Sequence, residues 1–172
     1  MKAYWIAALL AAGTAHAHVT VAPASAPAGA YATLVFKVGH GCDGSATTGI
    51  TVALPEGVTA KPMPKPGWTL NLVEGKLATP LQQHGKTIAT AVREITWRGG
   101  PLADAYYDEF TVQAKLPDTP GRYVFKVGQQ CEKGRIDWAD VVPAAGPASA
   151  PASKTPAPVL DVVPAGMPMH HH

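Results

Sequence analysis

The stretch FTVQAKL at residues 110–116 decides the fold class of this chain. Its apolar residues occupy every second position from Phe110 to Leu116, and polar residues fill the positions between them. This period of two is typical of a β-strand with one buried face. Related patterns predict strands at Tyr31–Val38, Thr48–Leu54 and Tyr123–Val127, and weaker patterns predict strands at residues 19–22, 68–73, 87–97 and 135–138.

Turn-forming residues separate these segments. Prolines and glycines mark breaks at residues 55–57, 66–67, 99–101 and 117–121. The chain holds 17 glycines and 17 prolines among its 172 residues, a content that disfavours long helices, and only residues 103–107 could form a helical turn. We therefore predict an all-β fold, an antiparallel β-sandwich of the immunoglobulin or cupredoxin kind with about seven to nine strands.

The two ends of the chain differ in composition from the region between them. Residues 1–17 combine Lys2, an apolar run and the sequence Ala15-His16-Ala17, which together predict a cleaved signal peptide. From Ala144 onward the chain is rich in Pro, Ala and Ser, a composition with little to bury. We therefore predict a sandwich domain at residues 18–143, a disordered tail at residues 144–172, and a periplasmic or secreted protein.

Charge and motif content exclude several classes of function. The chain has 14 Lys and Arg against 12 Asp and Glu, a net charge of +2, whereas nucleic-acid-binding proteins usually carry a basic patch or stripe. The sequence has no His-Glu-x-x-His motif, no Gly-rich phosphate loop, and no Ser, His and Asp set in a supporting context. We therefore expect a binding protein rather than an enzyme.

Cys42 and Cys131 are the two cysteines of the chain. An even count in an exported protein favours a disulfide, which would close a loop of about 90 residues. A pair of thiolates on copper is the alternative, although the two residues do not form a Cys-x-x-Cys motif. A disulfide would tie the loop after Tyr31–Val38 to the start of the segment that contains Trp138.

His18 would become the first residue of the mature chain after cleavage behind Ala17. Its α-amine and its imidazole Nδ1 could then chelate one metal ion together, and Cu(II) suits such nitrogen ligands. The sequence leaves open the alternative that cleavage leaves a histidine there by chance.

Four motifs resemble the YcnI-like copper-binding domain family. They are His18-Val19-Thr20-Val21, Lys65-Pro66-Gly67-Trp68, Tyr107-Asp108-Glu109-Phe110, and Cys131-Glu132-Lys133-Gly134 followed by Trp138. The resemblance spans residues 18 to about 140. It implies an extracytoplasmic all-β domain that binds Cu(II) through a brace at the N-terminal His18, helped by a carboxylate, with Trp138 beside the metal.

The carboxylate of the family does not transfer cleanly to this sequence. After Tyr31–Val38, where we look for an acid, the chain reads Gly39-His40-Gly41-Cys42-Asp43-Gly44. His40 in its Gly-flanked loop is a candidate ligand, and Asp43 is either a ligand or a turn residue before Gly44. Glu132 and Asp137 flank the Trp138 segment and could support the site from outside the ligand set.

The three tryptophans that follow the predicted leader divide into two groups. Trp68 and Trp97 are expected to pack in the core. Trp138 could instead shield one face of the copper ion, which favours holding the metal over reacting at it.

The chain ends in Met167-Pro168-Met169-His170-His171-His172. Thioether and imidazole groups together suit Cu(I), so Met167, Met169, His170, His171 and His172 are candidate Cu(I) ligands at the end of the tail. The alternative is that the three histidines are the remnant of a tag.

These observations predict an exported copper chaperone or buffer that serves copper delivery or resistance. Its partners would be the copper ion and another periplasmic copper carrier or a membrane copper transporter. Two alternatives remain open. One is a copper-dependent oxidative enzyme that uses the brace, and the other is a β-sandwich interaction module without metal.

Overall fold

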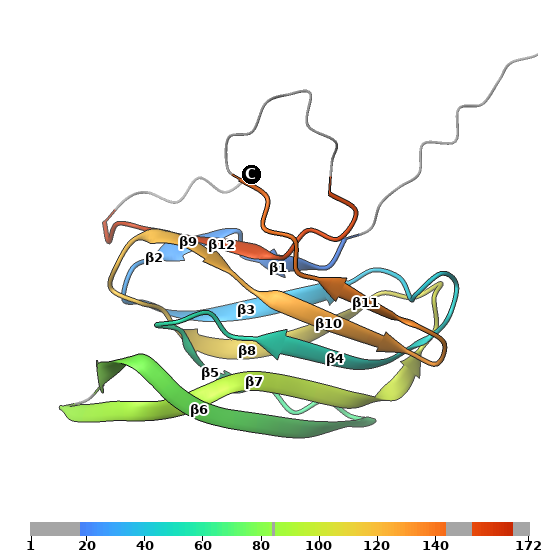
Figure 1. Cartoon of the computed structure of the whole chain (residues 1–172), viewed down its shortest axis with the longest axis horizontal. Coiled ribbons are helices and arrows are strands. Elements are labelled where there is room, and N and C mark those ends of the chain that lie inside the picture. The colour runs from blue at the N-terminus through green and yellow to red at the C-terminus, as the bar shows by residue number, and fades with distance from the viewer. Residues whose placement is uncertain (1–17, 84, 144–152, 167–172) are drawn as a thin grey trace, which may run out of the picture.

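A computed structural model describes residues 18–83, 85–143 and 153–166, and within them it contains twelve strands and no helix (Figure 1). One sheet has the order β1 (Thr20–Ala22), β3 (Tyr31–Val38), β8 (Asp108–Lys115), β5 (Thr59–Pro62). The second has the order β11 (Arg135–Trp138), β10 (Lys126–Cys131), β4 (Thr47–Ala53), β7 (Lys86–Leu102), β6 (Trp68–Gln83). The third has the order β2 (Ser25–Pro27), β12 (Val159–Val163), β9 (Gly121–Val124).

The all-β sandwich predicted from the alternating pattern is confirmed. In the part of the chain that the structure describes, every strand pair is antiparallel except β12 with β2. The described residues contain more strands than predicted, because β2, β5 and β12 were not recognised and Tyr123–Val127 is divided between β9 and β10. The possible helical turn at residues 103–107 is a single hydrogen-bonded turn, in which the Tyr106 amide donates to the Ala103 carbonyl over 3.0 Å.

Aromatic side chains join the two larger sheets. Phe110 from β8 packs edge-on against Trp97 from β7, with ring centroids 5.5 Å apart, and against Trp68 from β6 at 5.0 Å. Phe36 from β3 meets Phe125, which precedes β10, at 5.3 Å. Trp97 is fully buried and Trp68 packs against the core, so both tryptophans have the packing role predicted for them.

The predicted break at residues 99–101 is an irregularity inside β7 rather than its end. Gly49 of β4 faces Arg98, but Thr47 faces Leu102, so β7 accommodates two more residues than β4 between these pairs. A Cβ on Gly99 would lie 2.1 Å from the Gly67 carbonyl oxygen, which explains why glycine is required there. The strand therefore continues to Leu102 and carries the β7–β8 loop to the same end of the sandwich as the β3–β4 loop.

The predicted disordered tail is wrong for residues 159–163. These residues form β12, which pairs with β9 and β2, and Leu160 and Val162 of this strand are 0% and 3% exposed. The domain boundary predicted at residue 143 is therefore too early. The Pro- and Ala-rich composition obscured a short alternating segment, Val-Leu-Asp-Val-Val, that has its own inward face. Residues 1–17, 144–152 and 167–172, which include the predicted signal peptide, lie outside the described residues.

A segment before β12 is anchored by Asp140. The Asp140 carboxylate accepts hydrogen bonds from the hydroxyls of Ser153 and Thr155, at 2.7 and 2.9 Å. These two hydrogen bonds lower the pKa of Asp140. They fix the point from which the chain enters β12.

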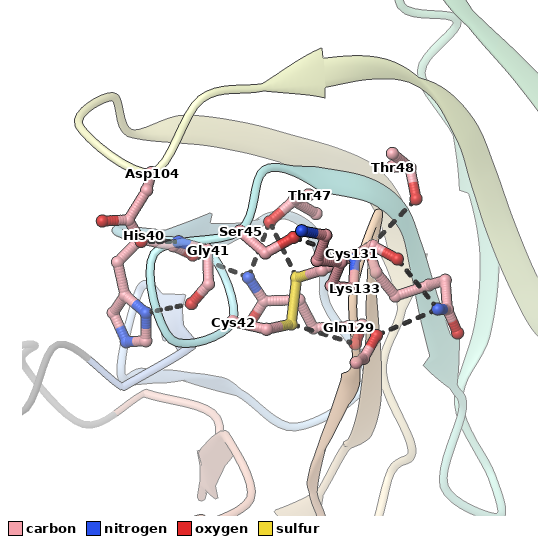
Figure 2. The surroundings of a disulfide bond; sticks show 12 residues. His40, Gly41, Cys42, Ser45, Thr47, Thr48, Asp104, Gln129, Cys131 and Lys133 are labelled. Atoms are coloured by element: carbon pink, nitrogen blue, oxygen red, sulfur yellow. Dashed lines mark hydrogen bonds between the residues drawn. A yellow bond between two sulfur atoms is a disulfide. The ribbon is translucent and has the colours of Figure 1, made fainter.

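The disulfide predicted between Cys42 and Cys131 is present (Figure 2). It ties the β3–β4 loop to the end of β10 across a sequence separation of 89 residues, and both cysteines are buried. Because the two sulfurs are bonded to one another, the alternative of a thiolate pair on copper does not describe this state of the protein.

Replacing Leu160 by Ala is predicted to destabilise the protein by about 2–5 kcal/mol, because it removes a fully buried side chain from the core. The measurement is denaturant unfolding, and the matched control is Asp161→Ala, an exposed neighbour on the same strand. Equal stability of the two variants would show that β12 contributes nothing to the core.

The double replacement Cys42→Ala and Cys131→Ala is predicted to lower the free energy of unfolding by about 2–5 kcal/mol, because the long loop is no longer closed in the unfolded chain. Denaturant unfolding of the variant and of the oxidised protein checks this. Finding two free thiols in unfolded, unreduced exported protein would contradict the bridge itself.

Candidate functional site

Strand register brings His18 to the β3–β4 loop. Thr20 of β1 faces Lys37 of β3, and continuing this antiparallel register by two residues places His18 opposite Gly39. His40 follows directly, in the loop between β3 and β4. Residues that are 22 positions apart in the sequence are therefore neighbours at one end of the sandwich.

Trp138 belongs to the core and is in ring contact with both of these histidines. Its ring centroid is 5.9 Å from that of His18 and 5.9 Å from that of His40, with interplanar angles of 78° and 71°. The Trp138 side chain is only 3% exposed, and it closes β11 opposite Val127 of β10. Two imidazoles thus stand edge-on against one buried indole.

The proton on His40 can be assigned from its hydrogen bond. The Nδ1 atom of His40 lies within hydrogen-bond distance of the Gly41 carbonyl oxygen, which can only accept. In the neutral ring Nδ1 therefore carries the proton, and the lone pair is on Nε2. This tautomer is the one that can offer Nε2 to a metal ion. Figure 2 shows the imidazole directed away from the disulfide.

Two residues that support the His40 loop were missed by the sequence analysis. The Gly41 amide donates to Asp104 Oδ1 over 2.8 Å, and Gln129 Nε2 donates to the His40 carbonyl over 2.6 Å (Figure 2). Gln129 could have been found, because it is polar at an inward position of a strand whose other inward residues are Val127 and Cys131. Asp104 has no signal in the sequence, since its contact depends on how two loops meet.

Asp43 has a turn role in the structure. Cys42 and Ser45 exchange backbone hydrogen bonds of 2.9 and 3.0 Å, and Asp43 and Gly44 between them have φ values of 50° and 80°. Asp-Gly with two positive φ values is a preferred two-residue hairpin turn. The exposed Asp43 side chain lines a shallow groove with Asp104 and Glu132. Among the described residues, the side-chain hydrogen bonds of His40 and Trp138 go to Gly41 and Gln129 and not to Asp43.

Glu132 and Asp137 do not flank the two histidines. Glu132 is exposed in that shallow groove. Asp137 points to the opposite face of β11 from Trp138 and pairs with Arg135 Nη2 at 2.7 Å. The hydrogen bond from Arg135 to Asp137 raises the pKa of the guanidinium.

Among the described residues, His18 and His40 are the candidate donors in ring contact with Trp138. Among residues 18–83, 85–143 and 153–166, no cluster of three or more His, Cys, Asp or Glu side chains could hold a metal ion. The imidazoles of His18 and His40, both beside the buried Trp138 indole, are suitable copper ligands when a further donor completes the site. The Met and His residues at 167–172, predicted as Cu(I) ligands, lie outside the described part of the chain.

The fold has a relative among solved structures. A protein from Nocardia farcinica, described as uncharacterized and as having an immunoglobulin-like fold, matches with a TM-score of 0.63 and 26% sequence identity over 84% of this chain and 97% of that one. A comparison with curated proteins found no match. No helix in the described residues is long and apolar enough to cross a membrane.

The family of the chain follows from a match across the whole sandwich. A family described as a domain of unknown function, DUF1775, matches residues 18–162. The match begins at His18 and reaches Val162 in β12, a strand that the structure also assigns to the domain. The chain therefore belongs to the DUF1775 family, which is the family of the YcnI-like domains that its motifs resemble.

Proposed function

We propose that this protein, once exported and processed, binds Cu(II) through His18 and His40 beside Trp138. The observation that carries the proposal is the contact of each of two imidazoles with the same buried indole, with ring centroids 5.9 Å from it in each case. These residues come from three separate segments of the chain, so their meeting is a property of the fold and not of one local motif.

The ligand count supports a role for the N-terminus. His18 and His40 supply two imidazole nitrogens, whereas Cu(II) favours square-planar or tetragonal sites with nitrogen and oxygen donors. Cleavage before His18 would release its α-amine as a third nitrogen, held next to the imidazole of the same residue. Copper, when bound, would supply a redox-active centre, and the protein residues would hold it and limit its access to water.

Trp138 favours a carrier over an oxidative enzyme. Its indole has no lone pair in the ring plane, so it contacts a metal only through its face. A buried indole on one side of the copper would exclude water and exogenous ligands there. The enzyme alternative predicts oxygen- or peroxide-dependent oxidation by the copper-loaded protein, and an assay for such turnover separates the two functions.

The remaining expectations extend this proposal. We propose a chaperone or buffer in the periplasm or outside the cell, which receives copper from, or passes it to, another copper carrier or a membrane copper transporter. Met167, Met169 and His170 to His172 would add a Cu(I) site on the C-terminal segment.

Adding one Ala before His18 is predicted to remove most high-affinity Cu(II) binding, because the nitrogen of residue 18 becomes an amide and can no longer donate as an amine. Calorimetric titration of Cu(II) into the processed and extended proteins measures the effect. Thermal unfolding of both metal-free proteins serves as the control for folding. Equal affinity would exclude the brace.

Replacing His40 by Ala is predicted to weaken Cu(II) binding by more than about 100-fold, beyond the range typical for loss of a supporting contact. The matched control is Asp43→Asn, which removes a carboxylate from the same loop and tolerates the positive φ of that turn. We expect this control to bind almost as the unchanged protein does. The opposite ranking would identify a brace closed by the Asp43 carboxylate.

A further inference from the structure

Gln129 is a fully buried polar residue in the interior of the sandwich. It lies on β10 between Val127 and Cys131, at an inward position that an apolar residue would normally fill. A buried amide costs free energy unless its hydrogen-bonding groups are satisfied. The partners of Gln129 therefore show what the amide does.

The amide of Gln129 is hydrogen-bonded to two residues of the candidate copper site, Trp138 and His40. Trp138 Nε1 donates to Gln129 Oε1 over 2.9 Å. Gln129 Nε2 donates to the His40 carbonyl oxygen over 2.6 Å and to Thr47 Oγ1 over 2.8 Å. These bonds connect β10 with β11, with the β3–β4 loop and with β4.

Its orientation is dictated by its partners. An indole N–H can only donate and a backbone carbonyl can only accept, so the oxygen of the amide must face Trp138 and its nitrogen must face His40. If the amide were rotated by half a turn, its N–H group would face the N–H of Trp138, and its oxygen would face the carbonyl oxygen of His40. A side chain with one donor end and one acceptor end is required at this position.

The loop that carries His40 needs such a constraint. His40 is flanked by Gly39 and Gly41, and glycine leaves the backbone free to take many conformations. The bond from Gln129 holds the His40 backbone itself, while the disulfide holds the loop two residues later. The same amide fixes the indole against which both imidazoles stand.

We propose that Gln129 is a positioning residue of the copper site, which sets the His40 backbone relative to the Trp138 indole. This inference rests on the proposed function, because it assigns the residue to the geometry of that site. Gln129 itself does not contact the metal. Groups that orient metal ligands in this way typically change metal affinity by about 10–100-fold when they are replaced.

The test replaces Gln129 by Met in the exported protein. Met has a similar size and offers neither the donor nor the strong acceptor, so the packing is largely kept while the three hydrogen bonds are lost. The matched control is Gln130→Met, an exposed neighbour on the same strand that contacts neither Trp138 nor His40. Thermal unfolding of each variant reports folding separately.

The first readout uses the metal-free protein. We expect Gln129→Met to shift the nuclear magnetic resonances of the Trp138 indole N–H and of the backbone amides at His40 and Gly41, and Gln130→Met to leave them in place. Unshifted resonances in Gln129→Met would overturn the positioning role.

The second readout is a Cu(II) titration with spin-resonance spectra. We expect the affinity of Gln129→Met to fall by about 10–100-fold and its copper spectrum to change, because a displaced His40 alters the ligand geometry. A folded variant with the affinity and spectrum of the control would overturn the inference. Loss of stability alone would not alter the spectrum of the folded fraction, so the spectrum separates positioning from a purely structural role.

A second variant covers the case in which Gln129→Met does not fold. Thr47→Val removes one acceptor of the Gln129 amide without touching His40 or Trp138. We expect shifts of the same resonances and a smaller loss of affinity, and the absence of both would overturn the inference. If the unchanged protein binds no Cu(II), the proposed function fails, and the metal-free spectra alone decide whether Gln129 positions the two side chains.

Discussion

The packing of the two larger sheets through aromatic side chains is the interaction on which the rest of the structure depends. Phe110 contacts Trp68 and Trp97 from the opposite sheet, at 5.0 and 5.5 Å between ring centroids, and all three belong to the core or pack against it. This packing fixes β3, β8 and β7 relative to one another. The end of β3 and the end of β7 therefore deliver their loops to the same end of the sandwich, where Asp104 of one loop accepts from Gly41 of the other.

At that end the interior changes from apolar to polar, and the buried Gln129 amide is hydrogen-bonded through both its oxygen and its nitrogen. Gln129 continues the inward positions of β10 beyond Val127, and its amide is matched by an indole donor, a carbonyl acceptor and a hydroxyl. The disulfide follows immediately, with Cys42 Sγ 3.8 Å from the Gln129 carbonyl oxygen. A polar network of this kind contributes little net stability compared with an apolar core, but it specifies one arrangement of the groups it joins. In our proposal, this specificity sets the His40 backbone relative to the Trp138 indole.

The sequence predicts the parts of this structure that depend on local patterns. Alternation identifies β3, β8 and β11, and cysteine count in an exported protein identifies the Cys42–Cys131 bridge. It does not predict β12, because Leu160 and Val162 follow a Pro- and Ala-rich segment and their burial depends on pairing with β9 and β2. Asp104 is hidden for the same reason: its hydrogen bond exists only after two distant loops meet. Gln129 lies between these cases, since its pattern position is visible while its partners are not.

The incomplete donor set of the described chain has a consequence for when the proposed site forms. Side chains supply two imidazoles beside Trp138, and within the described residues no third His, Cys, Asp or Glu completes a cluster with them. In our proposal the missing nitrogen is the α-amine of residue 18, which exists only after the peptide bond before His18 is cut. In the same proposal, Gln129 and the disulfide hold the loop that carries His40, and the cut before His18 supplies the last donor. In that proposal, copper binding is coupled to export and processing through a covalent step, the cleavage of the peptide bond before His18.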